Sequence, residues 1–206
     1  MSLKQDLKEL YASKKKEIIW VLVLGTSVLL LSLGATLTPI FGGHGEKELK
    51  EAREESTVLT DQIIDALKLS EESIDSLDPS LSGEELQNFI NGERERTLAI
   101  GEKGVEFSQK VNLLELGFQT AITVPTLQVT EVFMKLNAKF FSELTDYVDE
   151  SKDLIVLLER RSNNFRVEDL EVVAQIEKTQ RDIDSLYKVK EEYDSILPQF
   201  VSATGY

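Results

Sequence analysis

"LKEAREESTVLTDQIIDALKLSEESIDSL", residues 49–77, is the stretch of the sequence that decides the fold. Small and apolar residues recur in it at alternating spacings of three and four: Leu49, Ala52, Ser56, Leu59, Ile63, Ala66, Ser70 and Leu77, with Ser73 or Ile74 filling the one gap. This spacing places the residues on one face of an α-helix, while the positions between them are mostly charged or hydroxylated. The stretch therefore predicts a long amphipathic helix that buries one face.

Three more helices are predicted after this one, over residues 84–118, 127–161 and 167–197. Short connections around Pro79, around Pro125 and at 162–166 separate them. The second helix contains four glycines, each costing up to about 1 kcal/mol relative to Ala, so its continuity is an open question. Its predicted buried stripe is Leu86, Phe89, Ile90, Leu98, Val105, Val111 and Leu114.

The last two helices also carry apolar stripes. That of the third is Phe133, Leu136, Phe140, Leu144, Tyr147, Leu154 and Leu158; that of the fourth is Leu170, Val173, Ile176, Ile183, Leu186, Tyr193 and Leu197. Helices of similar length joined by short turns are typical of an up-down-up-down bundle. The predicted fold is all-α, with an antiparallel, coiled-coil-like four-helix bundle over residues 49–197 and a C-terminal tail over 198–206.

An uncharged run over residues 18–41 precedes the bundle. As a helix it would be roughly 36 Å long, enough for a hydrocarbon core of about 30 Å. The apolar core of a cleaved signal peptide is shorter, about 7 to 15 residues, and ends in small residues at the cleavage site. The run therefore predicts a single transmembrane signal-anchor helix, with a cleaved signal and a buried core helix as alternatives.

Three lysines, Lys14, Lys15 and Lys16, precede the run and favour the cytoplasmic side for residues 1–17. That segment is predicted to be a short amphipathic tail, and residues 42–48 a glycine-rich linker. The expected protein thus lies in the cell membrane as a single-pass protein, with its C-terminal domain outside the cytoplasm. The lipid bilayer is its first expected partner.

Three small residues, Gly25, Ser32 and Thr36, share one face of the predicted transmembrane helix. Small residues let a second membrane helix approach closely, so they are candidates for a packing face. Their incidental occurrence in an apolar segment is the alternative.

The predicted topology returns two weakly charged segments to the end of the bundle at which its first helix begins. One is the loop at residues 117–126, with Phe118, Ile122 and Val124, and the other is the tail with Phe200. These four residues are candidates for a membrane-proximal patch that contacts lipid headgroups or a membrane partner. The alternative is that Phe118, Ile122 and Val124 plug the open end of the bundle.

The composition excludes several classes of chemistry. The sequence has no cysteine, which removes thiolate nucleophiles. Its one histidine, His44, precedes the bundle, so Ser-His-Asp catalysis and multi-histidine metal sites are excluded from the bundle. Residues 46–206 carry 18 Lys and Arg against 34 Asp and Glu, a net charge of −16 that repels nucleic acid. We expect no enzymatic activity, no cofactor, no metal site and no nucleic-acid partner.

Three functions remain open. The first is a structural or accessory subunit of a membrane-associated complex, with a membrane protein as partner. The second is a self-assembling coiled-coil protein that pairs residues 49–77 between chains. The third follows from a layout over residues 46–197 that resembles the extracytoplasmic four-helix sensor domains of bacterial chemoreceptors, without a shared motif. That resemblance implies ligand sensing, but this sequence lacks a second membrane-spanning run.

Overall fold

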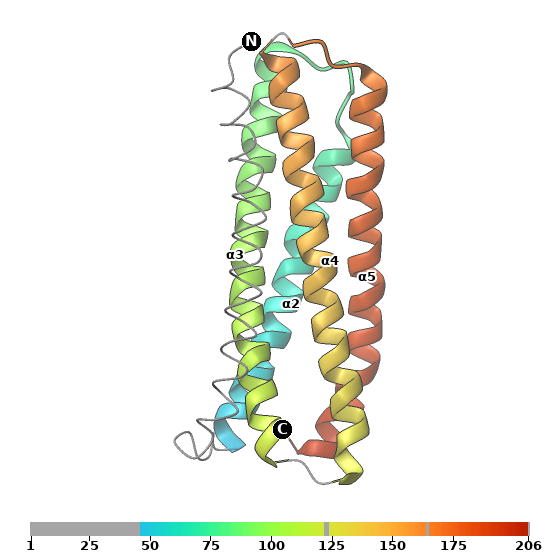
Figure 1. Cartoon of the computed structure of the whole chain (residues 1–206). Helices are drawn as coiled ribbons and strands as arrows, with labels where there is room; N and C mark the ends of the chain where they lie inside the picture. Colours follow the sequence, from blue (N-terminus) through green and yellow to red (C-terminus); the bar gives the residue numbers. More distant parts are fainter. Residues whose placement is uncertain (1–45, 122–123, 164, 206) are drawn as a thin grey trace, which may run out of the picture. The chain divides into compact units, whose positions relative to one another are not determined.

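The computed structural model describes residues 46–121, 124–163 and 165–205. They form four α-helices and no strand: α2 (Glu46–Asp75), α3 (Gly83–Ala121), α4 (Val124–Ser162) and α5 (Asp169–Thr204), shown in Figure 1. The all-α four-helix prediction is confirmed. The predicted N-terminal tail at 1–17, the apolar run at 18–41 and most of the linker at 42–48 lie outside the described residues.

The four helices form an antiparallel ring in which each contacts its two neighbours. Consecutive helices pack together, and α5 returns to α2 to close the ring (Figure 1). Leu49 near the start of α2 lies against Gly117 near the end of α3, and Phe107 of α3 meets Phe140 of α4 with ring centroids 5.3 Å apart. In these two pairs neighbouring helices run in opposite directions, which is consistent with a four-helix bundle.

The helix boundaries differ from the sequence prediction, most of all at the end of α3, the start of α4 and the end of α5. Helix α3 is continuous through its glycines and extends to Ala121, and α4 begins at Val124, so that Pro125 stands in its first turn, where a missing N–H costs nothing. Helix α5 continues through Pro198 to Thr204, where Gly205 in the left-handed conformation (φ 77°) ends it. The predicted tail at 198–206 is therefore mostly helix.

The buried stripes agree with the sequence for α2 and α4 and differ in part for α3 and α5. Leu98, Val105 and Leu170 are exposed rather than buried. The core positions of α3 are instead taken by Ile100 and Phe107. In α3 the core stripe repeats every seven residues, and Leu98 and Val105 lie to one side of it.

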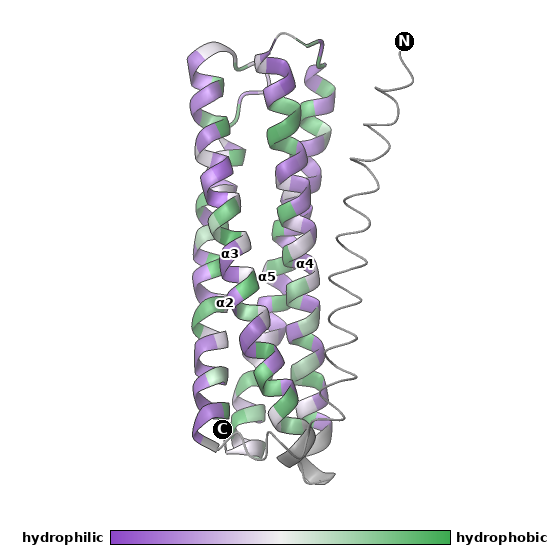
Figure 2. Cartoon of the chain, turned by 60° about the vertical axis from the view of Figure 1, so that its left-hand side comes forward, coloured by the Kyte–Doolittle hydropathy of each residue, from purple (hydrophilic) through white to green (hydrophobic). Residues whose placement is uncertain are grey.

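Two apolar clusters make up the core. The larger fills the half of the bundle toward the α2–α3 and α4–α5 turns. The smaller, here called the end cluster, consists of Leu49, Ala52, Leu114, Phe118, Phe133, Tyr193 and Phe200. Buried Ser56 of α2 and Asn137 of α4 lie between the clusters. Figure 2 shows hydrophilic and hydrophobic residues alternating along every helix, as amphipathic helices require.

Candidate functional site

The predicted patch residues that the structure describes are core residues. Phe118 and Phe200 are buried and meet edge to face, with ring centroids 5.4 Å apart. Phe200 also stacks on Phe133 at 4.1 Å. Ile122 and the side chain of Val124 lie outside the described part. The burial of Phe118 agrees with the alternative in which it plugs the open end of the bundle. Contact between this end of the bundle and a membrane or a partner stays a prediction.

A buried carboxylate lies at the centre of the larger cluster. Glu93 of α3 is fully buried, and its Oε1 accepts hydrogen bonds from Ser70 of α2 and, at 3.4 Å, from Ser151 of α4. Its Oε2 accepts from Nε of Arg96 at 3.0 Å. The half-buried Arg96 also donates to Oγ of Ser73 on α2 at 2.6 Å. One carboxylate thus links three helices.

Hydroxyl groups extend this network. Tyr147 of α4 donates to Oγ of Ser70 at 2.8 Å, and Thr97 of α3 shares a hydrogen bond of 2.7 Å with Ser151. Burial, and then the charge of Glu93, raise the pKa of Tyr147 above its ordinary range. Tyr147 therefore remains a hydrogen-bond donor at physiological pH. We call Ser70, Glu93, Arg96, Thr97, Tyr147 and Ser151 the polar layer.

The polar layer positions helices. Its carboxylate is shielded from solvent and engaged on both oxygens, so its hydrogen bonds are made within the bundle. A buried polar group costs free energy unless each partner is in place, so one axial register of α2, α3 and α4 is favoured over its neighbours. We therefore expect the polar layer to fix the register of these three helices.

The sequence contains a signal for this layer that the stripe assignment missed. Leu86, Glu93, Ile100, Phe107 and Leu114 follow one another at intervals of seven residues. A glutamate at a repeating core position predicts a buried charge that needs a partner. Arg96, three residues later on the same helix, is that partner.

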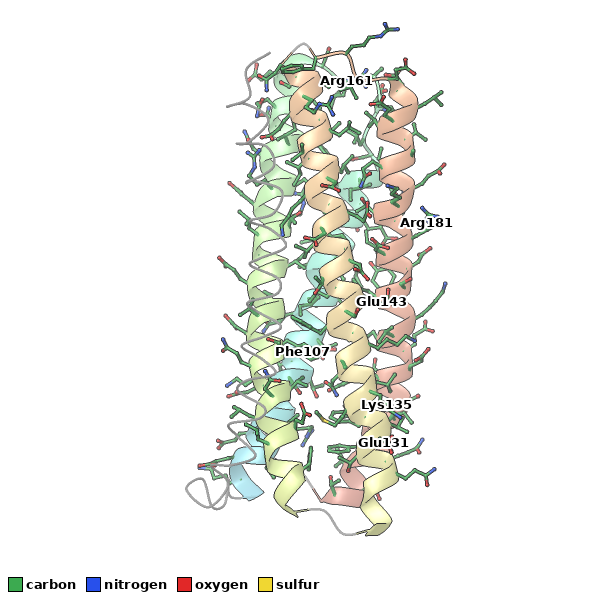
Figure 3. All side chains as sticks on the ribbon, in the orientation of Figure 1. Phe107, Glu131, Lys135, Glu143, Arg161 and Arg181 are labelled. Carbon is green, nitrogen blue, oxygen red and sulfur yellow. The ribbon has the colours of Figure 1, made fainter. Side chains whose placement is uncertain are left out.

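A second group of charges lies where α4 and α5 meet. Asp182 of α5 faces Glu143, Asp146 and Glu150 of α4, and its buried Oδ2 has no hydrogen-bond partner among the described residues. Burial, then the charges of Glu150, Asp146 and Glu143, raise the pKa of Asp182 to about 6, against the lowering effect of Arg181. Figure 3 shows Glu143 on α4 and Arg181 on α5. We therefore expect the stability of the α4–α5 contact to depend on the ionisation of Asp182.

Polar side chains also bridge α2 and α5, which approach each other less closely than the other three neighbouring pairs of helices. Tyr187 donates to Glu71 at 2.6 Å, and Lys190 reaches Asp61 at 2.9 Å and Asp194 at 2.6 Å. Burial alone would lower the pKa of Lys190, but the hydrogen bonds to Asp194 and Asp61 outweigh it, so the pKa of Lys190 is raised. We call this contact the α2–α5 seam.

Other predicted site residues lie outside the described part of the chain: Lys14, Lys15 and Lys16, and Gly25, Ser32 and Thr36. Within residues 46–121, 124–163 and 165–205, none of the helices combines the length and apolarity that crossing a bilayer requires. The same residues contain no cluster of three or more acidic or histidine side chains arranged to hold a metal ion.

No protein family, no curated protein and no solved structure matches this chain.

Proposed function

We propose that the chain is a single-pass membrane protein whose acidic helical bundle lies outside the cytoplasm and serves as a structural or accessory subunit of a membrane-associated complex. The observation that carries this proposal is the uncharged run at residues 18–41 directly before a bundle with its own core. Four helices bury their apolar stripes on one another, so the run is not needed to complete that core. A bilayer is the medium in which 24 uncharged residues are stable as a helix.

The short linker supports a membrane-proximal position for one end of the bundle. Five Cα–Cα steps separate Phe41 from Glu46, the first residue of α2, a reach of at most about 18 Å. The end of the bundle that contains Glu46 also contains the last turns of α3 and of α5. Under this proposal that end faces the bilayer, and the turns at 76–82 and 163–168 face away from it.

The packing of α2 favours a subunit over the coiled-coil alternative. Leu49, Leu59, Ile63 and Leu77 face the core of their own bundle. The heptads at 49–77 are thus occupied within one chain and are not available for pairing between chains in the same way. The polar layer likewise uses its titratable groups for internal contacts, which is typical of a structural rather than a catalytic role.

Membrane fractionation of the full chain tests the anchor. We expect the protein to stay in the membrane pellet after alkaline carbonate and to be released by detergent. Leu29→Lys combined with Leu30→Lys should release it to the supernatant, because charges at the centre of a span are unfavourable. Leu69→Lys, on the exposed side of α2, is the control, and this variant should stay in the membrane pellet. Release of the unaltered chain by carbonate would overturn the anchor.

Mass measurement of the detergent-solubilised protein tests the subunit role. A stable complex with another membrane protein, isolated from native membranes, is the expected result. A protein that is recovered by itself at every detergent concentration contradicts that role, even where the anchor is retained.

A further inference from the structure

The two apolar clusters of the core meet at a level of the bundle that is polar. The hydroxyl groups of Thr57 on α2 and Tyr193 on α5 share a hydrogen bond of 3.1 Å, and the ring of Tyr193 lies 5.3 Å from that of Phe133 on α4. These contacts place three helices at one level. Three fully buried polar residues, here called the boundary residues, lie within about one turn of it: Ser56, Thr60 and Asn137.

The hydrogen bonds of the boundary residues stay within their own helices. The hydroxyl of Ser56 donates to the carbonyl oxygen of Arg53 at 2.8 Å, and the hydroxyl of Thr60 donates to that of Ser56 at 2.8 Å. The amide of Asn137 donates to the carbonyl oxygen of Phe133 at 2.7 Å. The polar layer differs, because its carboxylate accepts hydrogen bonds from two other helices. These bonds of the boundary residues therefore do not join one helix to another.

Buried polar atoms without partners gather at this level and beyond it. In the described part of the chain, four buried polar side-chain atoms lack a hydrogen-bond partner, and three of them are Nε of Arg53, Oγ1 of Thr130 and Oδ1 of Asn137. Arg53 precedes the boundary residues of α2, and Thr130 precedes that of α4, so both lie on the side of the end cluster. A buried polar atom without a partner is less stable than the same atom in water. Opening this end would therefore hydrate three unpaired atoms.

The end cluster is also the smaller part of the core. It contains seven buried apolar residues, whereas the larger cluster contains twenty. In α5, Pro198 lies between Tyr193 and Phe200 of this cluster and has no N–H, so one hydrogen bond of the helix is missing there. Burial of apolar surface is the main term that keeps helices packed. The end cluster is therefore held closed less strongly than the larger cluster.

We propose that the end of the bundle that contains the end cluster opens as one unit while the larger cluster stays folded. Proteins open locally in such cooperative units, beginning with the least stable ones. In α2 the polar layer begins at Ser70, ten residues beyond Thr60, and it holds α2, α3 and α4 together there. The open form exposes the four aromatic rings of the end cluster, so this end has two forms with different surfaces. The unit comprises residues 46–56, 111–121, 124–136 and 194–204.

Cysteine accessibility tests the opening, because the sequence contains no cysteine. Ala52→Cys places a thiol in the end cluster and Val172→Cys places one in the larger cluster, at side chains that are 4% and 0% exposed. Val172 is the fourth residue of α5 and Ala52 the seventh of α2, so fraying of helix ends would label position 172 first. In the full chain in detergent, we expect a water-soluble thiol reagent to label position 52 about ten times faster than position 172.

Second substitutions in the Ala52→Cys chain show which contacts the opening breaks. Phe200→Leu, on α5, should raise the labelling rate at position 52 about fivefold, because both residues belong to the end cluster. Ile183→Val, also on α5 but in the larger cluster, should leave that rate within about twofold, since its contacts persist in the open form. Asn137→Leu removes the unpaired amide and should lower the rate about fivefold. Unchanged circular dichroism shows that each variant is folded.

Two outcomes would overturn the proposal. Equal labelling at positions 52 and 172 shows no separate opening of this end, and an equal rise for Ile183→Val and Phe200→Leu shows that only global unfolding exposes position 52. Thr130→Cys and Thr179→Cys, both at buried threonines, repeat the comparison between the two halves if either first cysteine variant does not fold. The labelling requires no bilayer, so it is read separately from the carbonate extraction that tests the anchor.

Discussion

Gly117 of α3 lies directly against Leu49 of α2: a methyl group added at Gly117 would lie 3.0 Å from Cγ and 3.1 Å from Cδ1 of Leu49, and closer still to Cδ2. Leu49 is buried in the end cluster, so it has little room to move. The missing side chain at 117 is what lets the start of α2 pack against the end of α3.

Gly117→Ala is therefore expected to destabilise the bundle by about 1 to 2 kcal/mol, although alanine is the better helix former. Gly101→Ala is the matched variant on the same helix. A methyl group there meets no atom within 4 Å, so this variant should gain about 0.5 to 1 kcal/mol. Thermal unfolding followed by circular dichroism measures both. Equal stability of the two variants would show that Leu49 adjusts freely.

Glu93→Ala should cost about 3 kcal/mol, because it leaves Ser70, Ser151 and the half-buried Arg96 without their partner. Glu159→Ala removes the carboxylate of the half-exposed pair with Arg94 and should cost less than about 1 kcal/mol. Urea unfolding of both variants gives the comparison. Similar losses at 93 and 159 would contradict a register-fixing role for the polar layer.

Asp182→Asn should stabilise the bundle at pH 7.5 and have little effect near pH 4. The folded pKa of Asp182 is about 6, above its ordinary 3.8. Its ionised form is therefore unfavourable in the folded state; the cost develops as pH rises between these values and is complete above pH 6. Because Asp182 is partly exposed, solvent screening limits the gain to about 1 kcal/mol, or about 2 to 4 °C in Tm.

Asp184→Asn controls for the change in net charge, since Asp184 is an exposed residue of the same helix. Its Tm should stay close to that of the unaltered chain at both pH values. A Tm gain for Asp182→Asn that persists at pH 4 would point to a cause other than ionisation.

Truncation after Leu197 should destabilise the bundle at least as much as Phe200→Ala, for which about 3 kcal/mol is expected. Phe200 is buried against Phe118 and Phe133, so the last turns of α5 belong to the core. Gln199→Ala, at the exposed neighbouring position, is the control and should change stability by less than about 0.5 kcal/mol. If the truncated chain were as stable as the full chain, the turns after Leu197 would not contribute to the core.

The fold could be predicted because the heptad pattern is strong in α2 and α4. Residues such as Leu59, Ile63, Phe140 and Tyr147 repeat at helical intervals, and all are buried. The turn residues between the apolar stripes predict where each helix ends, which gives four helices of similar length. From these lengths the antiparallel order follows without further information.

The remainder depended on tertiary contacts that a local pattern does not contain. Pro198 predicts the end of a helix, yet α5 continues through it. The helix continues because burial of Phe200 outweighs the cost of a proline in the helix. Leu98 and Val105 were assigned to the core by their apolarity, whereas Ile100 and Phe107 hold the core positions. Apolarity alone does not identify a core position.

The α2–α5 seam is the one place where the first and last helices meet, and long side chains hold them together there. If the chain before Glu46 is anchored in a membrane as proposed, tension along it would act on α2. We expect α2 to separate from α5 more readily than from α3, because its backbone approaches α3 more closely.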